Sequence, residues 1–83
     1  MEEIIRVRRN VLRYLDAHSI DYQGIGWPRL DQDGRHYHVT VRVVYEQREI
    51  PKTFDADFTV NRKRGTVNGR DFRRQMKRYK KHL

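Results

Sequence analysis

The chain has 83 residues, no cysteine and a formal net charge of +8. This length is that of one domain with a thin hydrophobic core, and the lack of cysteine excludes disulfide bonds and thiolate metal sites. Acids at Glu2 and Glu3 argue against a signal peptide, and no stretch has the run of about eighteen apolar residues of a membrane span. We therefore expect a single small cytoplasmic domain spanning residues 1–83.

Residues 3–18 have the pattern of an amphipathic helix. Apolar side chains recur at steps of three and four residues from Ile4 onwards. This period predicts a helix that packs one face on a core. Arg6, Arg9 and Arg13 fall on the opposite side of the predicted helix.

The middle of the chain predicts antiparallel strands. Residues 19–30 are interrupted by two glycines and a proline, which favours a weak edge strand with a bulge or bend. Residues 31–34 have the composition of a turn. Apolar and polar residues then alternate over 37–45 and again over 53–61, as in half-buried strands, with a charged connection ending at Pro51.

Pairing these two strands as a hairpin places their side chains opposite one another. We expect Val43 near Ala56 inside the sheet, and Val41 near Phe58. On the outer face, Arg42 should lie beside an aspartate, either Asp55 or Asp57. The charges of this face are then ordinary cross-strand ion pairs.

The positive charge is concentrated at the C-terminal end. Residues 61–83 carry ten basic side chains and one acid, Asp71, whereas residues 1–60 carry nine basic and ten acidic ones. Residues 62–65 predict a tight turn into a short return strand, Thr66-Val67, and Asn68 can cap a helix. In that helix an apolar stripe recurs with helical spacing, and every basic residue falls outside it. The stripe consists of Phe72, Met76, Tyr79 and Leu83.

These elements define the expected fold class, which is α+β. An N-terminal helix precedes a three- to four-stranded antiparallel meander, and a basic amphipathic helix ends the chain, giving the order α-β-β-β-α. Residues 61–83 form the basic turn and C-terminal helix of this single domain.

The basic segment is the candidate binding site. Cations held on one helix face can meet regularly spaced phosphates, and their binding releases condensed counterions. The alternatives are a solvated helix face and, less favoured, a helix lying on an anionic membrane. The arginines of the first helix could extend the surface. The candidate nucleic-acid-binding residues are Arg62, Lys63, Arg64, Arg70, Arg73, Arg74, Lys77, Arg78, Lys80 and Lys81.

Two other residue groups carry weaker signals. The alternation assigns Tyr37, Phe54 and Phe58 to the core, whereas Trp27 fits a core edge and an exposed stacking platform equally well. His36 and His38 point the same way on a strand near two carboxylates, which makes a metal or general-base site conceivable. Cross-strand ion pairing is the favoured interpretation, so we expect no enzymatic activity, no metal and no cofactor.

The order helix–strand–strand–strand–helix with a basic second helix resembles double-stranded-RNA-binding domains. The resemblance is topological. That family opens its second helix with a Lys-Lys-x-Ala-Lys run, and residues 68–74 lack it, so no RNA contacts carry over. Gly34-Arg35-His36 is faintly similar to small toxin ribonucleases. Residues 58–60 and 65–67 are similar to the closing hairpin of cystatin-like and PepSY-type domains, a pattern generic to hairpins.

Three functions remain open. The first is a non-enzymatic nucleic-acid-binding or accessory domain that contacts the phosphate backbone, of DNA or RNA, with little sequence specificity. The second is a protein-interaction module, an adaptor or inhibitor from a mobile element, whose basic helix docks on an acidic partner. The third is a small ribonuclease with His36 or His38 as base. An open sheet edge around residues 22–30 also allows homodimerisation by strand pairing.

Overall fold

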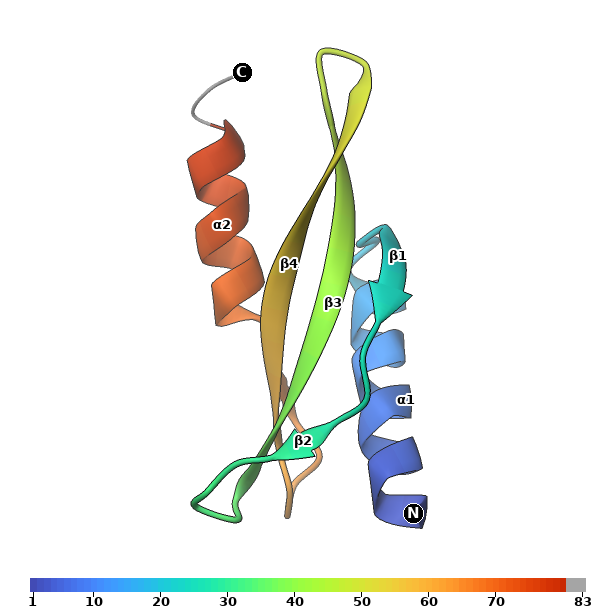
Figure 1. The fold of residues 1–83 in the computed structure, drawn as a ribbon, viewed down its shortest axis with the longest axis vertical. Coiled ribbons are helices and arrows are strands. Elements are labelled where there is room, and N and C mark those ends of the chain that lie inside the picture. The colour runs from blue at the N-terminus through green and yellow to red at the C-terminus, as the bar shows by residue number, and fades with distance from the viewer. Residues whose placement is uncertain (81–83) are drawn as a thin grey trace.

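A long antiparallel hairpin forms the centre of the molecule, with a helix on either side of it in projection (Figure 1). The computed structural model describes residues 1–80. Along the chain the elements are α1 (Glu2–Ala17), β1 (Tyr22–Ile25), β2 (Arg29–Leu30), β3 (His36–Gln47), β4 (Ile50–Asn61), β5 (Val67–Asn68) and α2 (Arg70–Lys80). The predicted α+β class and the α-β-β-β-α order are confirmed.

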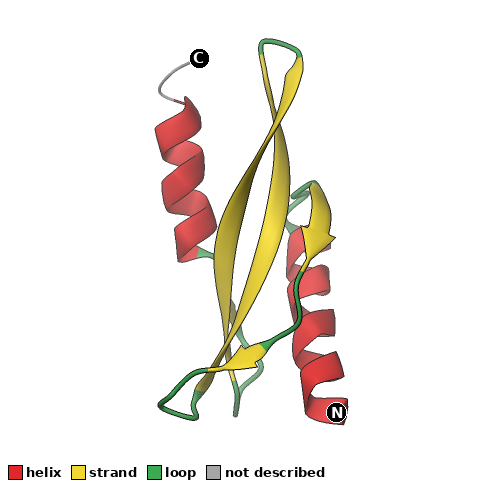
Figure 2. Cartoon of the chain, viewed as in Figure 1, coloured by secondary structure: helices red, strands yellow, loops and turns green. Residues whose placement is uncertain are grey.

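The sheet follows the order β1-β3-β4-β5, and β2 also pairs with β3. The weak strand predicted over residues 19–30 is thus split into two short pieces on the outer edge of β3, connected by the loop seen in Figure 2. The register shifts between Tyr22 and Gly24, which is the expected bulge. On the other side, the return strand predicted at residues 66–67 lies at Val67–Asn68.

The predicted hairpin register is wrong by two residues for the inward-facing pairs. Val43 lies opposite Phe54, and Val41 lies opposite Ala56. Arg42 lies opposite Asp55, which is one of the two aspartates expected beside it. The reason is the turn. Gln47 pairs with Ile50, so the turn holds only Arg48 and Glu49, both at positive φ. Such tight turns normally use Asn-Gly, because other residues lose about 1–2 kcal/mol each in this conformation.

Both helices cover the same face of the sheet. The Phe58 ring of β4 lies edge-on to Tyr14 of α1 and stacked with Phe72 of α2. Val7, Val11 and Leu15 of α1 are buried against this face, whose own buried residues alternate along β3 and β4. α1 packs against one half of the hairpin and α2 against the other, in a molecule of 40 × 20 × 18 Å (Figure 1). Within residues 1–80, no helix covers the opposite, polar face of the sheet.

Candidate functional site

The basic helix α2 is fixed by the apolar stripe that the sequence predicted. Phe72 stacks on Phe54 at 6.2 Å between ring centroids, and Tyr79 stacks on Tyr45 at 5.0 Å. Met76 is half-buried between them. The remaining predicted member of the stripe, Leu83, lies outside the described residues. The side of α2 that faces solvent is therefore set by these contacts.

The start of α2 is held by its cap and by close contact with α1. Asn68 accepts a hydrogen bond from the Arg70 amide at 2.8 Å, as the predicted cap should. Gly69 is buried, and a side chain there would come within 2.5 Å of the Tyr14 hydroxyl. The two helices therefore meet at Gly69 and Tyr14, where no larger residue fits without a shift.

Asp71 and Gln75 bind the otherwise open edge of β4. The Asp57 amide donates to Asp71 Oδ2 at 2.8 Å, and Gln75 Nε2 donates to the Asp55 carbonyl at 2.9 Å. Burial alone would raise the pKa of Asp71, but hydrogen bonds from the Asp57 amide, Gln75 and Arg74 lower it. The single acid of the basic segment thus has a structural role that sequence reasoning missed. The one sequence feature that points to this role is the spacing of Asp71 and Gln75, which are four residues apart and lie beside the apolar stripe of the helix.

The cations of α2 lie on its exposed side. Arg74 pairs with Asp71 at 2.6 Å, and Arg73 donates to the Tyr14 hydroxyl at 3.1 Å. Within residues 1–80, no hydrogen bond or ion pair engages the side chains of Arg70, Lys77 and Arg78, which are exposed. Lys80 belongs to the last turn of α2, and Lys81 lies outside the described residues.

The basic turn at residues 62–65 packs against the first half of α1 rather than beside the exposed side of α2. Asn10 Nδ2 donates to the Gly65 carbonyl at 3.2 Å, and Arg62 Nε donates to Glu3 at 2.8 Å. Hydrogen bonds from Arg62 and then Tyr37 lower the pKa of Glu3. Arg62 is therefore partly committed to holding the fold together.

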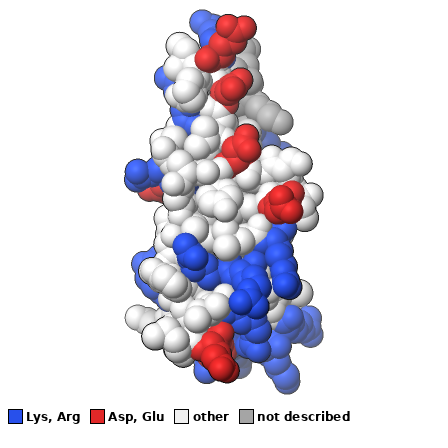
Figure 3. Space-filling model, turned by 90° about the vertical axis from the view of Figure 1, so that its right-hand side faces the viewer, with Lys and Arg blue, Asp and Glu red and all other residues white. Residues whose placement is uncertain are grey.

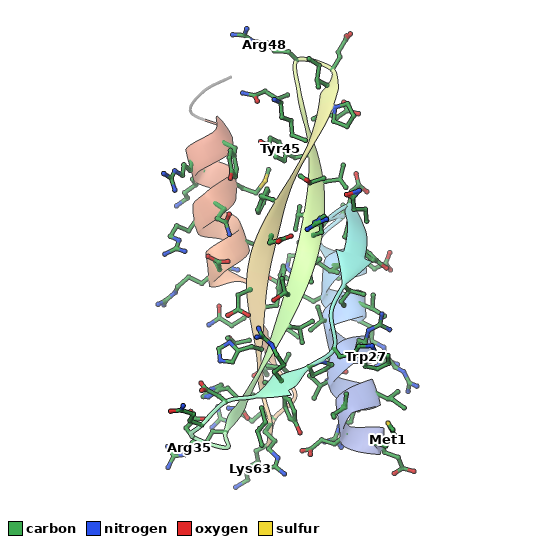
Figure 4. The ribbon with its side chains drawn as sticks, in the orientation of Figure 1. Met1, Trp27, Arg35, Tyr45, Arg48 and Lys63 are labelled. Carbon is green, nitrogen blue, oxygen red and sulfur yellow. The ribbon has the colours of Figure 1, made fainter. Side chains whose placement is uncertain are left out.

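Lys63 and Arg64 remain exposed at this end of the molecule, where Figure 4 places Lys63. Their amides donate to Asn61 Oδ1 at 3.0 and 2.8 Å, so the turn is rigid. A cleft of about 170 Å³ opens between the turn and α1. Its lining residues are Arg6, Val7, Asn10, Arg62, Lys63, Arg64 and Gly65.

The arginines of α1 extend the positive surface. Arg6, Arg9 and Arg13 are all exposed. On the side of the molecule that carries α1, Lys and Arg atoms gather over the lower half, and most carboxylates lie in the upper half (Figure 3). The predicted site thus comprises two cationic regions, the exposed side of α2 and the turn, and the turn packs against α1.

The histidines lie on the polar face of the sheet, as predicted. His38 is held between two carboxylates, with Nδ1 at 2.8 Å from Asp57 and Nε2 at 3.1 Å from Asp31. These hydrogen bonds, that of Asp31 first, raise the pKa of His38, which favours the protonated ring. In the described part of the chain, no cluster of acidic or histidine side chains could hold a metal ion. Both ring nitrogens of His38 are therefore engaged by carboxylates, as in the expected ion pairing of this face.

Stability should depend on pH through His38. A pKa raised above the ordinary value of 6.5 means that the charged ring stabilises the fold below that pH, and that this contribution disappears as the pH rises through the folded-state pKa. His38→Gln should therefore destabilise the protein more at pH 6 than at pH 9, measured by urea unfolding. His36→Gln is the matched control, because the His36 ring bonds a single, exposed carboxylate among the described residues, that of Asp33. Equal losses at both pH values for His38→Gln would contradict this assignment.

Fold and surface together define a small α+β domain that carries both helices on one sheet face and exposes basic side chains from each. Comparison with protein-family models, curated proteins and solved structures found no match to this chain. Among residues 1–80, neither helix is long and apolar enough to cross a membrane. The functional argument therefore rests on the chemistry of the surface.

Proposed function

We propose that this protein is a non-enzymatic nucleic-acid-binding or accessory domain that contacts phosphates through α2. The observation that carries the proposal is that Arg70, Lys77 and Arg78 have no ion-pair partner among residues 1–80 and project from a helix whose orientation is fixed by partly buried aromatic contacts. Cations that are pre-positioned and free of carboxylate partners release counterions from a polyanion without first breaking an ion pair.

The same helix supports weak sequence preference. Amide side chains are the usual readers of adenine, and Gln75 is the one amide of α2. Its Nε2 is already bonded to the Asp55 carbonyl and to Asp71. Contacts from α2 are then mainly to phosphates, which position a nucleic acid but carry little sequence information.

A salt titration tests this function. With about five phosphate contacts from α2, the logarithm of the affinity for duplex DNA should fall with the logarithm of salt concentration with a slope of about −4.5. Fluorescence anisotropy of labelled duplex DNA, single-stranded DNA and RNA, measured from low to moderate salt, gives this slope. Absence of binding to all three at low salt would refute the proposal.

A second candidate function is docking of an acidic protein segment. A groove of about 480 Å³ separates α2 from the C-terminal end of α1. Val43, Phe72 and Met76 give it an apolar lining. Arg73 and Lys77 contribute two cations, against one carboxylate from Asp21. This combination suits an acidic segment with hydrophobic side chains. Co-purification of one defined protein after nuclease treatment, lost on Met76→Glu, would support this candidate over the first.

A further inference from the structure

Trp27 is the only tryptophan of the chain, and 62% of its surface is exposed. It lies in the connection between β1 and β2, at the side of the molecule where α1 runs (Figure 4). The Arg8 guanidinium sits over the ring at 4.7 Å from its centroid. An indole with both faces covered would not keep so much exposed surface, so the face turned away from Arg8 is open to solvent.

The backbone that presents this ring is rigid. Just before it, the Gly26 amide donates to the Thr40 carbonyl at 2.8 Å. Just after it, Pro28 is buried, and a residue that precedes proline is restricted to extended conformations. β2 then pairs with β3 through Arg29 and Leu30. A ring held in this way loses little conformational freedom when a ligand stacks on it.

The surroundings of the ring are positively charged. Arg8 lies directly on it, and Nε of Arg8 is buried without a hydrogen-bond partner among the described residues. Arg9 and Arg13 are exposed on α1, one helical turn or about 6 Å apart. This spacing suits neighbouring phosphates of an extended strand. A flat aromatic face backed by one arginine, on the side of the molecule where α1 exposes Arg9 and Arg13, combines the two features with which proteins bind single-stranded nucleic acid.

We propose that Trp27 is a stacking platform for an unpaired base of single-stranded DNA or RNA, whose flanking phosphates bind Arg9 and Arg13. The inference rests on the proposed nucleic-acid-binding function and names its substrate class as single strands. In a duplex, each base is already stacked between its neighbours, so the ring has access only to unpaired bases. Arg8 supports the ring from beneath and adds its own positive charge.

Trp27 also provides the assay, because it is the only tryptophan that can report by fluorescence. The ligands are a short oligothymidine, an oligouridine, a blunt duplex and inorganic polyphosphate, which has the anionic chain without bases. The single strands should quench the emission strongly. Polyphosphate and the duplex should bind at low salt with little quenching.

Substitution separates stacking from charge. Trp27→Ala should weaken single-strand binding about tenfold, since one stacked base contributes on that scale, and should leave the salt slope unchanged because the phosphate contacts remain. Trp27→Phe should keep most of the affinity. Tyr22→Ala is the matched control, because Tyr22 is an exposed aromatic residue of the neighbouring strand β1, 43% exposed.

Several outcomes would overturn the inference. If Trp27→Ala binds single strands as tightly as the wild type, with the steep salt dependence retained, the platform is wrong and the proposed function stands. If polyphosphate quenches as strongly as the oligonucleotides, the ring senses charge and not stacking. If sedimentation shows a dimer that Trp27→Ala dissociates, a second copy of the chain covers the ring. Loss of all binding at low salt would contradict the proposed function itself.

Discussion

Replacing Arg70, Lys77 and Arg78 together with glutamine should weaken binding to duplex DNA by roughly 10²–10³-fold at about 0.1 M salt. Each lost phosphate contact reduces the steepness of the salt dependence by about 0.9, so the slope should become shallower by about 2.7. All three side chains are exposed, and glutamine has nearly the helix propensity of lysine and arginine. The unfolding free energy should therefore change little, and anisotropy titrations at several salt concentrations measure the effect.

A matched control removes the same charge elsewhere. Arg35 lies in the turn after β2, Arg42 on the polar face of the sheet, and Arg48 in the hairpin turn between β3 and β4. Their triple replacement with glutamine should leave the salt slope nearly unchanged. If both triple variants lose affinity equally, net charge and not the orientation of α2 determines binding, and the assignment of the interface to α2 fails.

Replacing Phe58 with alanine should leave the protein largely unfolded at 25 °C. Phe58 is fully buried and contacts both helices through Tyr14 and Phe72. Truncating a buried phenylalanine costs about 3–5 kcal/mol, and a domain of this size has a total stability of only a few kcal/mol. Urea unfolding followed by circular dichroism measures the loss.

Two further variants make that result specific. Phe58→Leu keeps most of the volume, so it should remain folded with a smaller loss of about 1.5 kcal/mol or less. Tyr22→Ala removes an exposed aromatic ring and should change stability by less than about 0.5 kcal/mol. If the free energy of unfolding of Phe58→Ala is within about 1 kcal/mol of the wild-type value, the helices do not depend on this shared contact.

Local patterns predicted the elements well. The three- and four-residue period from Ile4 onwards predicted α1 almost to its ends, and the alternation around Val41 and Phe58 predicted both long strands and their buried faces. The stripe at Phe72, Met76 and Tyr79 predicted which side of α2 is buried. These features follow from periods of 3.6 and 2 residues, which the sequence displays directly.

The register of the hairpin was not predictable in the same way. Either of two registers differing by two residues keeps the same side chains on the same faces, so alternation cannot separate them. The choice depends on the turn at Arg48 and Glu49, whose positive φ values are unusual for these residue types. The extended pairing of β3 and β4 stabilises a turn that local preference disfavours.

The candidate site also has features set by the local sequence and features set by long-range packing. The sequence determined that residues 61–83 are cationic and that α2 has a basic side, because charge and helical spacing are local properties. Long-range packing determined that the turn at Lys63 lies against α1, that Asp71 and Gln75 bind the edge of β4, and that the Trp27 ring faces solvent over Arg8. Each of these depends on contacts between residues far apart in the chain, which no spacing rule encodes.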